Sequence, residues 1–434
     1  MEIKSPGSGN RYLHYPDRVK KGEKRRMHYL DEATGGSRGG RWRWWGLLLL
    51  VVLAVSCGCT PENGGPPPIE PTVFQVEWER TFGGGGRSCG YGVQEAGDGG
   101  FIITGQAESE GDGGQLYLLK VDREGNREWE RYFGGPGRAL GYYAQPTKDG
   151  GYIVGGQITA ERESDGYLVK TDSQGEEEWE GSFGGREDDN ILYVAPVSDG
   201  GYIACGWSES FNSRRELYLL KVNREGKREW ESHFCRGSRS SGSHVLETAD
   251  GGFLVTGTVD RSGESGYGER DIYLVKVDGE GKLEWEEILG GSSDEEGFFA
   301  QPEGERGYVA AGQSFSYSTG TTSVYLVGLD EEGEPRWEKN IESNDSYLGL
   351  SVHPALEGGY LILGQVMDAE SYRGISLAKA DHQGKKEWVL YLGGGRNCSG
   401  QWALQVDAES YLVVGWIEEE GNGERELYLA KIQP

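Results

Sequence analysis

Arginines recur at one place in the repeated part of this 434-residue chain, five residues after an aromatic or leucine residue that ends a strand-like segment. They are Arg87, Arg138 and Arg239, with Arg396 in a shorter loop, while Asp188 and Asp294 take the place in two other loops. Converging guanidinium groups bind carboxylate or phosphate through paired hydrogen bonds. We therefore predict the four arginines as ligand-binding residues. The alternative is that each one closes its own loop.

Motifs for catalysis or metal binding are scarce. The stretch from Gly86 to Gly90 matches Gly-x-Ser-x-Gly, but a nucleophile elbow needs a strand–turn–helix context that this loop lacks. The six histidines show no metal-ligand spacing. We assign structural roles to His244 and His353, which occupy the same strand of two non-adjacent repeats. We predict no catalytic residue, no metal site and no cofactor, although the acidic loops leave weak Ca²⁺ binding open.

The elements that position these residues are seven copies of one unit. Tryptophan recurs at 78, 129, 179, 230, 285, 337 and 388. The phrase that begins Leu116-Tyr117-Leu118 returns in register in every unit. The first full unit holds four strand-length segments, at residues 90–96, 100–106, 115–122 and 127–133, joined in pairs by tight glycine turns. This arithmetic predicts an all-β fold, a seven-bladed β-propeller of four-stranded antiparallel blades over residues 75–434.

The two ends of the repeat predict how the ring closes. Residues 76–82 form an outer-type strand with no preceding partner, and residues 426–433 form a third-type strand with no successor. Open sheet edges promote aggregation. We therefore predict that the N-terminal strand pairs with the C-terminal strand and completes the seventh blade.

The repeated phrase Tyr-Leu-(Val/Leu)-Lys-Val-Asp-x-x-Gly-x-x-x-Trp resembles the repeats of bacterial and archaeal quinoprotein-like (PQQ-like) propellers, many of which are exported lipoproteins. The resemblance covers residues 75–434. It implies architecture and export rather than an activity. The quinone-dependent members use an adjacent cysteine pair, and no two cysteines are adjacent in this sequence.

The N-terminal region has the features of an export signal. Residues 1–45 hold 11 basic and 5 acidic side chains, a net charge of +6. The apolar run at 47–55 is too short for a membrane span of ~20 residues and has the length of a signal-peptide core. Cys57 follows it directly and Cys59 comes next, so we predict lipidation at one of them. An ordinary cleaved signal and an uncleaved anchor are the alternatives. We assign 1–59 to this region and 60–74 to a Pro/Gly-rich linker.

The cysteines of the body suggest a disulfide in an oxidising compartment. Cys89 and Cys398 precede the first strand of two blades that become neighbours after closure. We predict a possible Cys89–Cys398 bond across the closing seam, with free thiols as the alternative. Cys205 and Cys235 lie in one blade with a strand between them, at ~9–10 Å, which is too far for a bond without distortion.

Charge and loop variation set the predicted function. Outside residues 1–45 the chain has 33 basic and 66 acidic residues, a net charge of −33, which opposes nucleic-acid binding. One face of the ring carries short uniform turns, and the other carries variable loops. The variable loops lie at 108–114, 161–165, 260–270, 314–323 and 418–426. Binding in repeat proteins usually resides on such a face.

We therefore predict a monomeric binding or scaffold module for a protein or glycan partner. Its predicted location is extracytoplasmic, in the cell envelope, held to the membrane by its lipid anchor. The alternative is an envelope polysaccharide-active enzyme that uses two loop carboxylates ~5–10 Å apart.

Overall fold

The structure is a computed structural model that describes residues 75–433 apart from 84–85, 109–113, 136, 161, 213, 262–269, 304–306, 316–322, 342–347, 357, 368–372, 394–395 and 419–422. The predicted signal region with Cys57 and Cys59, the 60–74 linker and the central parts of several variable loops lie outside the described residues. In the described part of the chain, no helix has the length and hydropathy that a membrane span requires.

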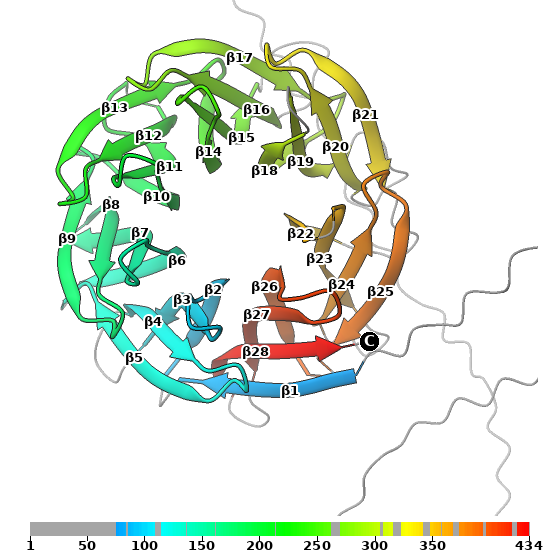
Figure 1. The fold of residues 1–434 in the computed structure, drawn as a ribbon. Helices are drawn as coiled ribbons and strands as arrows, with labels where there is room; N and C mark the ends of the chain where they lie inside the picture. The colour runs from blue at the N-terminus through cyan, green and yellow to red at the C-terminus, as the bar shows by residue number, and fades with distance from the viewer. Residues whose placement is uncertain are drawn as a thin grey trace, which may run out of the picture. The chain divides into compact units, whose positions relative to one another are not determined.

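The described residues form seven four-stranded antiparallel sheets arranged as blades around a central axis (Figure 1). The innermost strands of blades 1–7 are β2 (Ser88–Glu95), β6 (Arg138–Pro146), β10 (Asp189–Pro196), β14 (Arg239–Glu247), β18 (Glu295–Pro302), β22 (Leu348–Pro354) and β26 (Cys398–Gln405). The second strands are β3 (Phe101–Ala107), β7 (Tyr152–Ala160), β11 (Tyr202–Ser208), β15 (Phe253–Asp260), β19 (Tyr308–Ser314), β23 (Tyr360–Met367) and β27 (Tyr411–Glu418).

The two outer positions of each blade follow the same order. The third strands are β4 (Gln115–Val121), β8 (Glu163–Thr171), β12 (Glu216–Val222), β16 (Arg270–Val277), β20 (Ser323–Leu329), β24 (Arg373–Ala380) and β28 (Arg425–Gln433). The outermost strands are β5 (Arg127–Phe133), β9 (Glu177–Phe183), β13 (Arg228–Phe234), β17 (Leu283–Leu289), β21 (Pro335–Ile341), β25 (Lys386–Leu392) and, for blade 7, β1 (Gln75–Phe82). The predicted seven-bladed propeller is therefore confirmed.

The predicted closure is also confirmed. β1 pairs antiparallel with β28, from Gln75 opposite Gln433 to Phe82 opposite Leu427. The first and last strands lie side by side in Figure 1 and complete blade 7. The 28 strands from β1 to β28 belong to one compact unit, and the pairing of β1 with β28 closes its ring.

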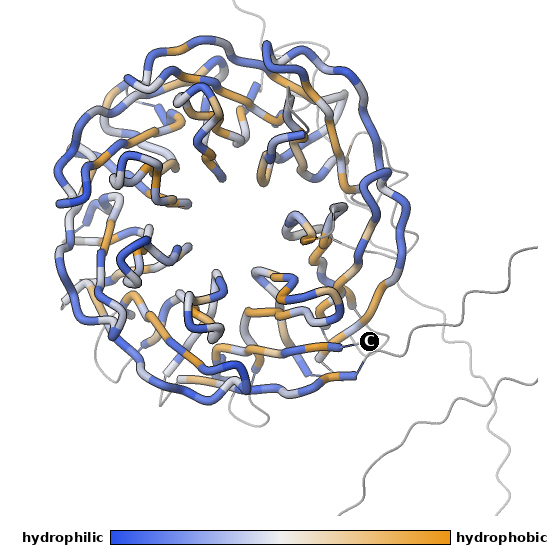
Figure 2. The backbone as a smooth tube through the Cα atoms, in the orientation of Figure 1, coloured by the Kyte–Doolittle hydropathy of each residue, from blue (hydrophilic) through white to orange (hydrophobic). Residues whose placement is uncertain are grey.

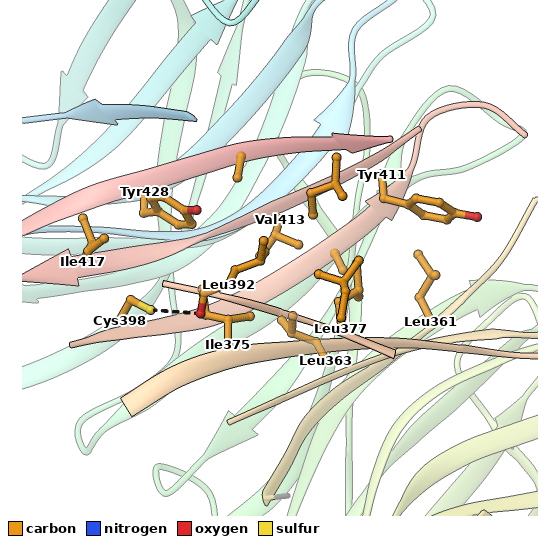
Figure 3. Close-up of a cluster of buried hydrophobic side chains, with 14 of the residues drawn as sticks. Leu361, Leu363, Ile375, Leu377, Leu392, Cys398, Tyr411, Val413, Ile417 and Tyr428 are labelled. Carbon is orange, nitrogen blue, oxygen red and sulfur yellow. Dashed lines mark hydrogen bonds between the residues drawn. The ribbon is translucent and has the colours of Figure 1, made fainter. Parts of the chain in front are cut away.

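The core lies between neighbouring blades. Figure 3 shows the cluster between blades 6 and 7, where Leu363, Ile375 and Leu377 of blade 6 face Val413 and Tyr428 of blade 7. The second and third strands read as nearly continuous buried runs, whereas the outermost strands are largely exposed. Figure 2 shows the same division as a mainly hydrophilic outer ring around more hydrophobic strands.

The recurring tryptophan and the recurring turn glycine meet at these interfaces. Gly125, in the turn between β4 and β5, has φ +76°, and a Cβ there would lie 2.7 Å from the Trp78 ring of blade 7. The same contact joins Trp129 to Gly175, Trp179 to Gly226, Trp230 to Gly281 and Trp285 to Gly333. Glycine is therefore required at this turn for two reasons, its backbone conformation and the approach of the neighbouring indole.

The two faces of the ring differ as the sequence predicted, with one exception. We call the face with the turns between first and second and between third and fourth strands the hairpin face, and the opposite face the loop face. The hairpin turns repeat closely, as with Gly99 bonding to Ala96 and Gly125 bonding to Asp122. The predicted loop at 161–165 is largely strand, because β7 and β8 pair as far as Ala160 opposite Glu163.

Candidate functional site

The charged residues that recur in the blades form structural ion pairs. In blade 2 the buried Lys170 ammonium lies 3.0 Å from the Asp149 carboxylate and 2.8 Å from that of Glu178. The same arrangement joins Lys120 to Asp98 and Glu128, Lys221 to Asp199 and Glu229, and Lys276 to Asp250 and Glu284. Burial opposes ionisation of Asp149, but hydrogen bonds from the Thr147 hydroxyl, the Lys170 ammonium and the Gly151 amide lower its pKa to about 2.

A second recurring pair joins the third and fourth strands. The Tyr117 hydroxyl donates to the Glu130 carboxylate at 2.6 Å. The pattern returns in Tyr218 with Glu231 at 2.9 Å, in Tyr428 with Glu79 at 2.7 Å, and in Tyr167 with Glu180 and Tyr273 with Glu286. Burial and the adjacent carboxylate raise the pKa of Tyr117, so its hydroxyl stays protonated as the donor. These carboxylates are therefore engaged in holding the blades together.

The loop position predicted to carry arginines has a loop-closing role in three blades. The carboxylate of Asp188 accepts a hydrogen bond from the Ser164 amide at 2.8 Å, and that of Asp294 accepts from the Arg270 amide at 3.2 Å. In blade 7 the Asn397 side chain accepts from the Arg373 amide at 3.2 Å. Asn397, five residues after Leu392, is therefore the counterpart of Asp188 and Asp294, and Arg396 lies one residue before it.

Arg396 departs from the predicted arc. Its guanidinium pairs with Glu79 on the outermost strand of blade 7 at 3.1 Å and donates to the Gly393 carbonyl at 3.3 Å. Arg87 and Arg138 are exposed on the loop face. The ion pair therefore holds Arg396 toward the outermost strand of blade 7, and no described contact joins it to Arg87 or Arg138.

Arg239, the fourth predicted arginine, lines a cleft of about 430 Å³ on the loop-face side of blades 3–5. The other lining residues are Arg215, Ser240, Ser241, Ser243, Thr258, Asp260, Arg270, Glu296, Gly297 and Phe298. The cleft thus combines guanidinium, hydroxyl and carboxylate groups. We call it the loop-face cleft.

Fixed contacts orient two arginines of the loop-face cleft. Arg270 pairs with Asp294 at 2.9 Å and also with Glu296. The Arg215 guanidinium lies 3.7 Å from the centre of the Trp207 ring and pairs with Glu209 at 3.0 Å. Sequence reasoning missed Arg215 and Arg270, because Arg215 directly precedes the third strand of blade 3 and Arg270 begins the third strand of blade 4, away from the loop where arginine recurs.

A raised carboxyl pKa on the loop face bears on the enzyme alternative. Burial and the nearby Asp189 carboxylate raise the pKa of Asp165. Asp189, however, accepts hydrogen bonds from the Gly185 amide and the Ser210 hydroxyl, both at 2.7 Å. Glu295 makes equivalent bonds to its own loop in blade 5. Both of the Asp189 hydrogen bonds end on Oδ2, so this oxygen of Asp189 closes its own loop.

The cysteines of the body are free thiols in the structure, so the Cys89–Cys398 bond is not formed there. Cys89 lies one residue before the glycine that pairs with the second strand, and Cys398 lies two residues before its counterpart. Because side chains alternate along a strand, the two cysteines face opposite sides. The Cys398 thiol points to the Leu392 carbonyl of blade 6 at 3.9 Å (Figure 3), away from blade 1. Cys205 and Cys235 are also unpaired with each other.

The axis holds a second feature, which the sequence analysis missed. Each innermost strand has a register shift, and the first paired residue after it lies at the same level in all seven blades. Bulges of this kind redirect side chains. The seven residues, which we call the axial ring, are Gly92, Tyr143, Tyr193, His244, Phe299, Ser351 and Trp402.

The aromatic members of the axial ring contact one another across the centre. The centres of the Tyr143 and Tyr193 rings are 4.4 Å apart, and those of Tyr143 and Trp402 are 4.7 Å apart. Blade 1 lies between the blades of Tyr143 and Trp402, and its Gly92 contributes no side chain there. His244 contacts Tyr193 with ring centres 4.5 Å apart. The only available signal in the sequence was the aromatic content of the innermost strands.

The fold and the sites together define a seven-bladed β-propeller, with a polar cleft on its loop face and a circle of mainly aromatic side chains at its axis. No family model and no curated protein matches the sequence. Among solved structures, the chain is similar to a protein of unknown function from Dyadobacter fermentans, with 9% identity, a TM-score of 0.48 and coverage of 83% of this chain and 99% of the other.

Two further structures show the same likeness. The puromycin hydrolase S511A mutant has 12% identity and a TM-score of 0.50, and the match covers 79% of this chain and 53% of the hydrolase. The β-propeller domain of the Trilobed protease from Pyrococcus furiosus has 11% identity and a TM-score of 0.46, with coverage of 80% and 95%. At these identities the likeness concerns the fold alone.

Proposed function

We propose that this protein is a non-enzymatic binding module that takes a glycan partner in the loop-face cleft. The cleft itself is the observation that carries the proposal. Its guanidinium, hydroxyl and carboxylate groups suit the many donors and acceptors of a sugar, and Phe298 adds an apolar surface. The recurring charged groups of the blades are already engaged with one another, whereas Arg239 of this cleft is not part of those recurring pairs.

The test is glycan-array binding with the fragment 71–434, which contains the whole closed ring. We expect Arg239→Ala to weaken the retained glycans at least about fivefold, because one charged hydrogen-bonding group is lost. Arg138→Ala is the matched control, since Arg138 holds the same strand position in blade 2 and does not line the cleft. Equal losses in both variants, or retention of proteins but not glycans, would contradict the proposal.

The enzyme alternative requires two cooperating carboxylates, and the Asp165–Asp189 pair is the one that the pKa shift favours. If it were catalytic, the fragment would release new reducing ends from a bound polysaccharide, and Asp165→Asn would abolish this release while leaving binding intact. Our account expects no release from either protein.

We also propose that the module is exported and tethered to the membrane by a lipid on Cys57 or Cys59, as its resemblance to exported PQQ-like propellers implies. The support is the short apolar run and the cysteine that follows it. The double variant Cys57→Ala, Cys59→Ala should lose lipid labelling and leave the membrane fraction. Retention of the unlabelled variant in membranes would favour an uncleaved anchor.

A further inference from the structure

A cavity of about 340 Å³ lies at the axis, on the hairpin-face side of the axial ring. The rings of Tyr143, Tyr193, His244, Phe299 and Trp402 line it, together with His353. The rest of its lining is Gln94, Leu246, Ala300, Gln301, Pro302, Pro354, Leu356, Ala403, Leu404 and Gln405. Its volume is at the lower end of the range for small-molecule sites, ~300–1,000 Å³, and its lining is mainly apolar, as such sites are. We call it the axial cavity.

The axial cavity is electrically neutral. None of the described side chains that line it is acidic or basic apart from the two histidines. Burial lowers the pKa of His244 to about 4, and burial together with the nearby His244 lowers that of His353 to about 3, so both are uncharged at neutral pH. A charged ligand would lose its hydration with no described opposite charge to replace it, which is strongly unfavourable.

Few polar groups of the axial cavity are available to a ligand. Both ends of the Gln405 amide are engaged, accepting from the Leu356 amide at 3.0 Å and donating to the Asp407 carbonyl at 3.0 Å. Gln94 donates to the Tyr143 hydroxyl, and the His353 Nε2 pairs with the Ser351 hydroxyl at 2.8 Å. A sugar buried there would leave hydroxyl groups without partners, at a cost of ~1–3 kcal/mol each.

Among the described residues, one fully buried polar atom of the lining lacks a partner. The His244 Nδ1 is inaccessible to solvent and forms no hydrogen bond with any described residue. Buried polar atoms in native structures are nearly always paired, so an unpaired one calls for a specific explanation. A neutral imidazole nitrogen can donate or accept. A rotation of the His244 ring would bring this atom to the surface of the axial cavity, where a ligand with one polar substituent would satisfy it.

In the part of the chain that the structure describes, the lip of the axial cavity is apolar and exposed. Leu356, in the hairpin turn of blade 6, is 65% exposed, and Pro302 and Pro354 are exposed beside the cavity. A ligand can therefore enter from the hairpin face, without passing the loop-face cleft.

We infer that the axial cavity binds an uncharged aromatic small molecule of one or two rings, with one or two polar substituents. Its flat face would pack against the aromatic rings of Tyr143, Tyr193 and Trp402. Aromatic pairs contribute beyond their buried area, which favours an aromatic ring over an aliphatic one.

The test is calorimetric or saturation-transfer NMR titration of the 71–434 fragment with indole as the probe. We expect saturable binding with a Kd of about 1 mM or tighter, as a ligand of this size allows. Indole-3-acetate and tryptamine carry a negative and a positive charge on the same ring, and each should bind at least about tenfold more weakly. Failure of indole to saturate, tighter binding of either charged analogue, or competition by methyl α-glucoside would overturn the inference.

Two matched pairs of variants locate the binding. Trp402→Leu should weaken indole at least about fivefold, whereas Trp416→Leu should leave it within about twofold. Trp416 belongs to the same blade but packs beneath Arg425, 4.0 Å from its guanidinium, and does not line the cavity. Equal losses in both variants would overturn the inference.

The second pair avoids the core, so its folding is not at risk. Leu356→Glu places a charge at the lip and should weaken indole at least about threefold. Leu283→Glu, at an exposed position on β17, should not. Equal indole affinity in these two variants would count against entry at this lip. Glycan retention by the same proteins reports on the loop-face cleft separately, so failure of either site is distinguishable from failure of the other.

Discussion

The interfaces between blades and the axis of the ring are built in opposite ways. The same contacts return from blade to blade: an indole packs over a turn glycine of the next blade, and within a blade a buried lysine lies between two acids and a tyrosine bonds to a glutamate. At the axis, one position shared by all blades holds six residue types in seven blades, from Gly92 to Trp402. A residue that recurs in register is explained by packing. The residues at the axial position change in type from blade to blade, so repeated packing does not explain them. We propose ligand binding as the explanation.

In blade 5 a different pair of residues fills the space that a buried lysine takes in other blades. Gly328 stands where the other blades have the buried lysine, and the Trp337 indole fills the space, since a Cβ at Gly328 would lie 2.1 Å from its Nε1. The blade is therefore closely packed at this position even where the lysine and its ion pairs are absent. The size of the side chain is not preserved at the axis. Gly92 and Ser351 occupy the position at which the other five blades carry a large ring.

Removing the closing strand should have the largest effect. Deletion of residues 1–83 removes β1 and exposes the edge of β28 over its whole paired length. We expect aggregation, or a fall in the thermal unfolding midpoint of about 10 °C or more, since several kcal/mol of packing and hydrogen bonding are lost. Circular dichroism melting with light scattering measures both outcomes.

Deletion of residues 1–70 is the control and should leave the melting midpoint unchanged, because β1 remains intact. The same midpoint for both truncations would show that blade 7 does not need β1.

A smaller effect is expected from one interface glycine. Gly125→Ala forces a positive φ on alanine and drives its Cβ into the Trp78 ring, and we expect a loss of about 3 kcal/mol in the free energy of unfolding. Gly135→Ala has the same backbone strain, with φ +60°, but no described atom lies within 4 Å of its Cβ. We expect a loss of only about 1 kcal/mol there. Equal shifts in denaturant melts would remove the interface from the explanation.

The axis should reveal itself in the pH dependence of stability. Because the folded pKa values of His244 and His353 are about 4 and about 3, the unfolded chain binds more protons than the folded one below pH ~6.5. Stability should therefore be full above that pH and fall by several kcal/mol as the pH drops toward 4, since each pKa unit corresponds to about 1.4 kcal/mol. The aspartates paired with the buried lysines act in a lower pH range. The folded pKa of Asp149 and Asp250 is about 2, so their contribution to the free energy of unfolding is lost below pH ~4.

The double variant His244→Gln, His353→Gln separates the two windows. Its denaturant midpoint should lose most of the slope between pH 6.5 and 4, leaving the contribution of His233, whose pKa burial also lowers, and should keep the fall below pH 4. An unchanged slope in the upper window would mean that the axial histidines are not buried in the neutral form.

The sequence was sufficient for what repeats and insufficient for what does not. Recurring tryptophans and glycine turns predicted the number of blades, the closure and strand bounds within about two residues. A one-residue difference in register, however, reverses the direction of a side chain. That is why Cys89 and Cys398 seemed equivalent and Arg396 was assigned the place of Asn397.

The axial ring was harder to predict for a related reason. Its seven residues are of six types and are far apart in the sequence, so only the closed ring with its seven register shifts brings Tyr143, His244 and Trp402 together. The loop-face cleft was predicted through Arg239 alone, since its other arginines come from a different loop.

The most direct test of the contrast between interface and axis measures two quantities on two tryptophan variants of the 71–434 fragment. Trp230 is a recurring interface residue over Gly281, and Trp402 is an axial one. We predict that Trp230→Leu lowers the melting midpoint by several degrees with the indole Kd unchanged, and that Trp402→Leu raises the indole Kd at least about fivefold with less than half of that midpoint loss. Variants that lose stability and indole affinity in the same proportion would contradict the division of the molecule into a repeated scaffold and an axial site.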